Sequence, residues 1–300
     1  MATEIVAERA AFLCRIAEEA NTENAASNPL VYIIGSEVPV PGGAHEELDD
    51  LVVSRTEDVQ ETIDITKKAF YDLELQQAWE KVIAVVVQPG VEFSNSKVVS
   101  YKPLKAKALS KTIEHYPKLC YEAHSTDYQT QEDLGNLVQD HFAILKVGPG
   151  LTFALREAIF ALGYIENELF SSPAKQKKKS GIFSVIDTVM DENTQYWEKY
   201  YVGDTYEQYY NRRFGLSDRI RYYFPDQRIT EAIRKLTDNL IKEEIPDALL
   251  SQFLPEQYKK VKNTELENNP HALISDKIKL VLNDYSKACS AKENYTLLTS

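Results

Sequence analysis

Four separate apolar runs, each ending in polar residues, constrain the fold of this chain more than any other feature. The runs cover residues 30–37, 81–87, 118–123 and 142–147. Their hydrophobicity is continuous rather than alternating, which is typical of strands buried on both faces of a parallel sheet. Helical patterns lie between them, near residues 57–79, 103–116 and 130–140. These spacings suit strand–helix–strand crossovers. The sequence therefore predicts an α/β fold with four successive strand–helix units.

The rest of the chain has only helical patterns. Apolar residues at helical spacing predict further helices over residues 3–20, 151–170, 229–240 and 273–285. No strand pattern follows the fourth apolar run. We therefore expect residues 1–170 to form a domain of strand–helix units, and residues 171–300 to form a helical extension packed on it.

The charge balance and the cysteines narrow the function classes. The 34 Lys and Arg against 46 Asp and Glu give a net charge of −12, which argues against binding to nucleic acid or to an anionic membrane. The basic run Lys175–Lys179 predicts a solvated loop. Three widely spaced cysteines are typical of a reducing compartment and indicate no disulfide framework. With no signal pattern or membrane-length apolar stretch, we expect a cytoplasmic protein.

Polar side chains follow each predicted strand. In a parallel barrel the active site lies at the carboxyl ends of the strands. Those ends and the loops after them supply Glu37, Gln88, Glu92, His124, Asp127 and Lys146. His124 suits metal binding or proton transfer, and equally a buried structural role. A catalytic zinc usually takes three protein ligands, so this lone histidine predicts no metal site.

Most of the other strand-end residues have two possible roles, one functional and one structural. Glu37 would orient a substrate hydroxyl or bind a metal, or it would cap loop amides. Asp127 would share the work of His124 or form a turn. Lys146 would bind a phosphate or form a Schiff base, or it would make a salt bridge inside the barrel. Gln88, followed by Pro89, is a stiff and uncharged exit.

Glycines next to two strands suggest contact with a ligand. Gly148 and Gly150 lead directly into the helix that contains Thr152, and amides at a helix start can hold a phosphate. Gly42 and Gly43 allow close approach to a ligand, or form a plain turn. The sequence has no Walker-type loop, GxGxxG fingerprint or kinase motif set, so it predicts no nucleotide cofactor.

The segments around these strand ends resemble one family, the non-catalytic Z subunits of D-tagatose-1,6-bisphosphate aldolase, formerly labelled tagatose-6-phosphate kinases. The matching segments are residues 35–43, 87–93, 121–130, 140–149, 151–162, 217–223 and 251–255. The similarity runs from the first helix to about residue 285. Ser36 and Gly150 depart from the family, which commonly has Thr and Ala there.

The resemblance implies a fold and a role. The fold would be a TIM barrel related to class II aldolases. The role would be to support the stability and activity of a separate, zinc-carrying catalytic subunit during galactitol or N-acetylgalactosamine breakdown through tagatose 6-phosphate. This chain would then carry no catalytic residue, metal or cofactor of its own, although the strand-end pocket would still take a phosphosugar.

The resemblance also bears on assembly, and two other functions stay open. The family chain begins with four more strand–helix units, so we expect strands five to eight of the barrel here, and an oligomer. One alternative is a metal-dependent sugar-phosphate aldolase that uses Glu37, His124 and Asp127. The other is a tagatose-6-phosphate kinase, which the missing nucleotide motifs disfavour.

Overall fold

The computed structural model describes residues 3–24, 30–35 and 51–290, which form two compact units. The first unit comprises residues 1–93, 97–147 and 285–300, and the second comprises residues 94–96 and 148–284. Each unit is described by itself below. The sequence predicted a boundary at residue 170, between a barrel and a helical extension. The compact units do not test that boundary, which stays a prediction.

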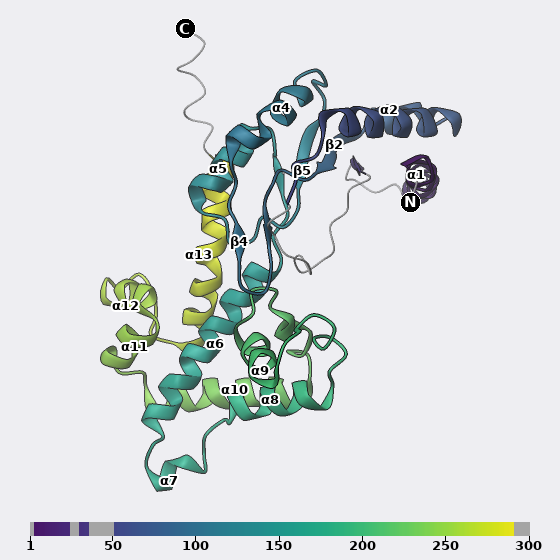
Figure 1. Cartoon of the computed structure of the whole chain (residues 1–300). Coiled ribbons are helices and arrows are strands. Elements are labelled where there is room, and N and C mark those ends of the chain that lie inside the picture. The colour runs from purple at the N-terminus through teal and green to yellow at the C-terminus, as the bar shows by residue number, and fades with distance from the viewer. Residues whose placement is uncertain (1–2, 25–29, 36–50, 291–300) are drawn as a thin grey trace. The chain divides into compact units, whose positions relative to one another are not determined.

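A four-stranded parallel sheet forms the centre of the first unit (Figure 1). Its strands, in spatial order, are β1 (Tyr32–Ile34), β2 (Val82–Val87), β5 (Cys120–Ala123) and β6 (Ile144–Leu145). All three pairings are parallel, which confirms the α/β prediction with a parallel sheet. Within the described ranges, β1 and β6 each pair with one neighbour, so the sheet is open there.

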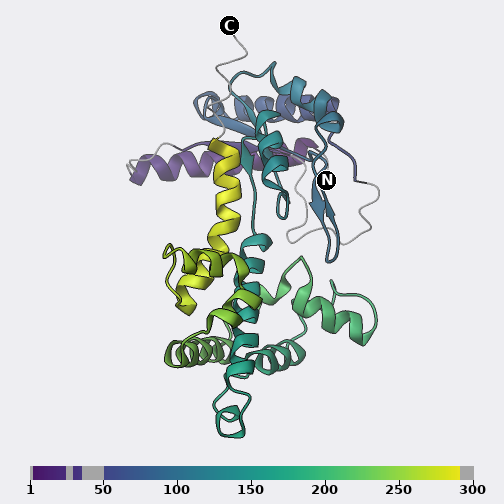
Figure 2. The ribbon, with the colours of Figure 1, turned by 90° about the vertical axis from the view of Figure 1, so that its left-hand side faces the viewer.

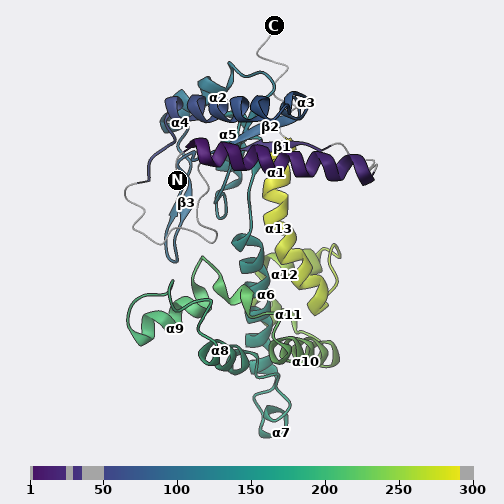
Figure 3. The same cartoon turned by 90° about the vertical axis from the view of Figure 1, so that its right-hand side faces the viewer.

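Helices accompany the strands of the first unit. They are α1 (Thr3–Asn24), α2 (Thr56–Asp72), α3 (Gln76–Trp79), α4 (Pro103–Ile113) and α5 (Gln131–Gln139). Helices α1 and α2 lie side by side (Figure 3). Apolar side chains of these helices, including Phe70, Leu109 and Leu137, share one buried core with Val85 and Tyr121 of the sheet. The helices therefore bury the face of the sheet that carries Val85 and Tyr121.

A small antiparallel hairpin lies between β2 and α4, where we predicted no strand. It consists of β3 (Glu92–Phe93) and β4 (Val98–Val99). Two residues per strand are too few to show an alternating pattern. Gln129 ties the hairpin to the loop after β5, since its side-chain amide donates to the Val99 carbonyl over 3.0 Å and its oxygen accepts from the Tyr101 amide over 2.9 Å.

The second unit is helical in its described residues. Its elements are α6 (Pro149–Leu169), α7 (Pro173–Gln176), α8 (Ile182–Glu192), α9 (Thr205–Phe214), the 3-10 turn η2 (Arg219–Tyr222), α10 (Gln227–Glu243), α11 (Asp247–Phe253), α12 (Pro255–Lys262) and α13 (Pro270–Ser290), whose last turns belong to the first unit. Helix α6 is in contact with α8, α10 and α11 (Figure 2). Short α7 occupies the start of the predicted basic loop. No described helix is long and apolar enough to cross a membrane.

Candidate functional site

The register of the sheet brings three predicted residues to one edge. Val87 of β2 pairs with Ala123 of β5, which in turn pairs with Leu145 of β6. The next residue along each strand is therefore an exit residue at the same level. These residues are Gln88, His124 and Lys146.

A carboxylate that we did not select from the sequence lies at the centre of this edge. Glu122 belongs to β5, and its side chain is only 4% exposed. Successive strand residues point to opposite faces, so Glu122 points away from Tyr121, which is in the buried core. Glu122 Oε1 lies 2.7 Å from His124 Nε2 and 3.6 Å from Lys146 Nζ. The three side chains therefore form one cluster from two neighbouring strands.

The second oxygen of Glu122 differs from the first. Glu122 Oε2 is buried and makes no hydrogen bond with the residues that the structure describes. A buried carboxylate oxygen has lost its hydration, and burial without a compensating hydrogen bond is costly. The cluster is thus incomplete at a defined atom.

The hydrogen bond to Glu122 also sets which tautomer a neutral His124 adopts. When the imidazole is neutral, Nε2 carries the proton that it donates to the carboxylate, and Nδ1 is left as an acceptor. The ring is about one quarter exposed, and in the described part of the chain Nδ1 has no hydrogen-bond partner. A carboxylate-oriented imidazole of this kind can accept a proton or a hydrogen bond.

Two further predicted acids, Glu92 and Asp127, are buried near this edge. They are 5% and 3% exposed. Burial raises the pKa of the Glu92 carboxyl above its ordinary value, and the negative charge of Asp127 adds to the increase. Hydrogen bonds from the Phe93 amide and the Ser125 side chain lower that pKa but do not cancel the increase. Glu92 therefore favours its neutral form more than an exposed glutamate does.

The loop that follows β5 is held in an unusual conformation. Ser125 and Tyr128 have positive φ angles of 53° and 64°, which non-glycine residues seldom adopt. The Thr126 hydroxyl donates to the Lys146 carbonyl over 2.7 Å, and the Tyr285 hydroxyl donates to the Thr126 carbonyl over 2.8 Å. Such backbone strain persists where surrounding contacts fix the chain, and it concentrates at functional sites.

Gln88 has a structural role at the same edge of the sheet. Its side-chain oxygen accepts hydrogen bonds from the amides of Gly90 and Val91, over 2.8 Å and 3.1 Å. Its backbone amide donates to Ser54 Oγ over 2.8 Å. The side chain thus shapes the turn after β2. The remaining candidates of the first unit, Glu37, Gly42 and Gly43, lie outside the described residues.

The predicted phosphate site falls in the second unit, at the start of α6. Gly148 is the N-cap of the helix, and Gly150 is buried in its first turn. The Thr152 hydroxyl donates to Asp218 Oδ2 over 2.6 Å, and the same carboxylate accepts from Arg156 Nε over 2.7 Å. This carboxylate would repel a phosphate held by Thr152. Phosphate binding through the backbone amides stays a prediction.

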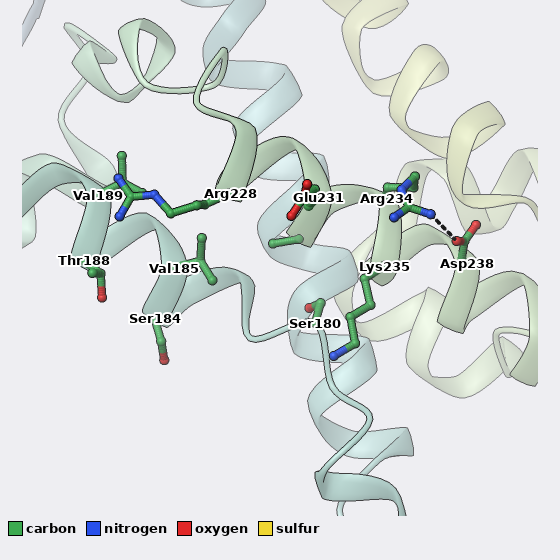
Figure 4. A pocket seen from close by; sticks show the side chains of 11 residues that line it. Ser180, Ser184, Val185, Thr188, Val189, Arg228, Glu231, Arg234, Lys235 and Asp238 are labelled. Carbon is green, nitrogen blue, oxygen red and sulfur yellow. Dashed lines mark ion pairs between the residues drawn. The ribbon is translucent and has the colours of Figure 1, made fainter.

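A hollow of about 570 Å³ lies on the second unit between α8 and α10 (Figure 4). It is lined by Ser180, Ser184, Val185, Thr188, Val189, Arg228, Glu231, Ala232, Arg234, Lys235 and Asp238. Its charged side chains are of both signs. Arg228 pairs with Asp226 and Glu192, and the Ser180 hydroxyl donates to Glu166. This hollow therefore offers no field of one sign to a ligand.

Comparison with known proteins places this geometry in context. The family described as D-tagatose-1,6-bisphosphate aldolase subunit GatZ/KbaZ-like matches residues 1–290. A crystal structure described as a probable tagatose 6 phosphate kinase from Sinorhizobium meliloti 1021 is 39% identical, with a TM-score of 0.85. The match covers 96% of this chain and 68% of that one. In the residues that the structure describes, no group of three or more His, Cys, Asp or Glu side chains is arranged to hold a metal ion.

Proposed function

Because this chain belongs to the GatZ/KbaZ-like family of D-tagatose-1,6-bisphosphate aldolase subunits, we propose that it is the non-catalytic subunit that supports a separate catalytic one. The observation that carries this proposal is the family match over residues 1–290. The complex would cleave tagatose 1,6-bisphosphate in the cytoplasmic breakdown of galactitol or N-acetylgalactosamine through D-tagatose 6-phosphate. The contacts of Gln88 agree with a non-catalytic role, because its side-chain oxygen is already hydrogen-bonded to two amides of the turn after β2.

The proposal includes the architecture of the first unit. Its open parallel sheet would correspond to strands five to eight of a (β/α)8 barrel, which closes when every strand has two neighbours. The 68% coverage of the solved relative supports this view, since part of that chain has no counterpart in the match.

A second function has one observation in its favour. The pairing of Glu122 with His124 orients the imidazole as it would in an acid–base catalyst, which fits an aldolase in its own right. That enzyme would use Glu37, His124 and Asp127 with a metal ion. The name of the solved relative refers to a kinase, and the absence of a nucleotide-binding motif from the sequence argues against transferring that activity.

Activity assays with and without the catalytic subunit test the proposal. We expect no cleavage of tagatose 1,6-bisphosphate by the purified chain alone. We also expect the catalytic subunit to keep several-fold more activity after heating when the chain is present, because a ligand that binds only the folded state stabilises it. The matched control is the catalytic subunit heated with an equal mass of an unrelated acidic protein.

Two outcomes would overturn the proposal. One is cleavage by the isolated chain that disappears in the His124→Ala variant, which would rule out a contaminant and establish the second function. The other is an unchanged heat-inactivation rate of the catalytic subunit at saturating chain concentration, which would remove the supporting role.

A further inference from the structure

Helix α10 carries a stripe of charged side chains along the hollow that it forms with α8. The stripe consists of Arg228, Glu231, Lys235 and Asp238, in this order along the helix (Figure 4). Spacings of three and four residues place all four on one face. Arg234 lies about 100° further round the helix than Lys235, outside the stripe, and pairs with Asp238 at 3.8 Å. Along the stripe itself the charge therefore changes sign at every step.

The two central charges of the stripe have no ion-pair partner in the residues that the structure describes. Glu231 accepts a hydrogen bond from the Gln227 side chain over 2.8 Å, and Lys235 is exposed. Glutamate four residues before lysine is the order that favours an ion pair within a helix, yet these two side chains do not form one. The two outer charges already have partners within the chain. The middle of the stripe thus offers one charge of each sign.

The order of the signs makes the stripe complementary to a second copy of itself. In two antiparallel α10 helices centred on residue 233, Glu231 of one copy is level with Lys235 of the other, because each is two residues from the centre. Arg228 is level with Asp238 for the same reason. Opposite charges therefore meet at all these contacts. A parallel pair in the same register would instead bring identical charges together.

We propose that the α10 stripe is a surface for self-association, on which α10 of a second copy packs antiparallel across a two-fold axis. Such an axis makes the same patch of both copies meet, which the sign order of the stripe requires. The second helix covers Val185, Val189 and Ala232 of the hollow, and this burial favours association. Exposed ion pairs contribute little individually, so the charges mainly fix the direction and register of the helices. The proposal does not depend on the supporting role.

Charge reversal in the full-length chain tests the pairing. Glu231→Lys and Lys235→Glu each place like charges at both central contacts of the dimer. We expect each to raise the dissociation constant of the dimer, measured by sedimentation equilibrium, about tenfold or more. An equimolar mixture of the two variants has opposite charges at both contacts again, and so does the double variant Glu231→Lys/Lys235→Glu. We expect both samples to associate about as tightly as the wild type.

The matched control is Lys279→Glu on α13, which makes the same change in net charge as Lys235→Glu at an exposed position outside the hollow. We expect it to leave the dissociation constant unchanged. Association through any other surface is common to all samples and cancels from the comparison. The proposal is overturned if the single variants associate as tightly as the wild type, or if the mixture associates no more tightly than either variant alone. A double variant that associates as weakly as the single variants would overturn it as well.

Discussion

Glu92 shows how a single buried residue contributes to the pH dependence of stability. Its pKa in the folded chain is raised above the ordinary value of 4.5, mainly by burial. The folded state therefore binds this proton more tightly than the unfolded state does. Between the ordinary and the raised pKa, the free energy of unfolding falls as pH rises, and above the raised pKa the full penalty is present. Below the ordinary value the penalty is absent.

We therefore expect Glu92→Gln to be more stable than the wild type at neutral pH. Its amide keeps an oxygen for the Phe93 amide, which donates to Glu92 Oε1 over 3.0 Å, and it removes the buried charge. The gain should shrink as pH falls through the raised pKa and vanish below 4.5. Urea unfolding over a pH series measures it. A gain that is constant with pH would show that the carboxyl does not titrate as described.

The sequence showed the candidate site only in part. His124 and Lys146 were predictable because His124 follows an apolar run, Lys146 lies near the end of another, and parallel strands end at one edge. Glu122 was missed because it interrupts a run that reads as strand. Its one signal was its spacing of two residues from His124, which puts both on the same face. The partner of Thr152, Asp218, is 66 residues further along the chain, and no local pattern predicts such a contact.

At the scale of elements, β1 and β2 approach each other closely at Gly35. A Cβ atom there would lie 2.7 Å from Val86 Cβ, an atom fixed to the strand backbone. We expect Gly35→Ala to lower the free energy of unfolding by about 1–3 kcal/mol, as overpacking in a core does. Urea denaturation followed by circular dichroism measures the change.

Gly135 provides the matched control for that substitution. It lies inside α5, and a Cβ there would meet nothing within 4 Å. Gly135→Ala should therefore raise the free energy of unfolding by about 0.5–1 kcal/mol, the usual advantage of alanine in a helix. Equal effects of the two substitutions would mean that the β1–β2 contact at Gly35 is not tight.

Element type was predictable where a periodic pattern was long enough. The strand predicted over 118–123 is observed as Cys120–Ala123, and the helix predicted over 130–140 as Gln131–Gln139. The strand was predicted two residues too early, because Lys118 and Leu119 precede the paired residues without a break in the pattern. The β3–β4 hairpin was not predictable, since its position depends on contacts such as that between Gln129 and Tyr101.

At the scale of the whole molecule, the α/β class followed from the order of the apolar runs, whereas the limits of the compact units did not. Helix α6 reads as the partner of the fourth strand, yet it belongs to the second unit. Its buried residues Ile159, Leu162 and Ile165 pack in a core with Leu236 and Trp197. Contacts between residues far apart in the sequence decide which unit a helix belongs to. A local periodic pattern does not predict such contacts.

Exposed apolar surface on the first unit leads to a prediction about association. In the described ranges, β1 pairs only with β2, and the side chains of Val31, just before this strand, and Ile33, within it, are 55% and 40% exposed. On α1, Phe12 and Leu13 are 48% and 65% exposed. A strand edge of this kind is a template for pairing with another chain.

We therefore expect the chain to associate, with itself or with the proposed catalytic subunit, and size-exclusion chromatography with light scattering measures this. The mass in isolation should exceed 34.2 kDa and rise with concentration. Burying a leucine stabilises by about 1.5–3 kcal/mol, so Leu13→Lys should shift the mass toward that of the monomer. The control is Leu104→Lys on α4, since Leu104 is 87% exposed and outside the α1 surface.

A single 34.2 kDa species at every concentration, unfolding cooperatively, would contradict self-association. If that monomer also formed no complex with the catalytic subunit, the exposed α1 surface would have no role in assembly.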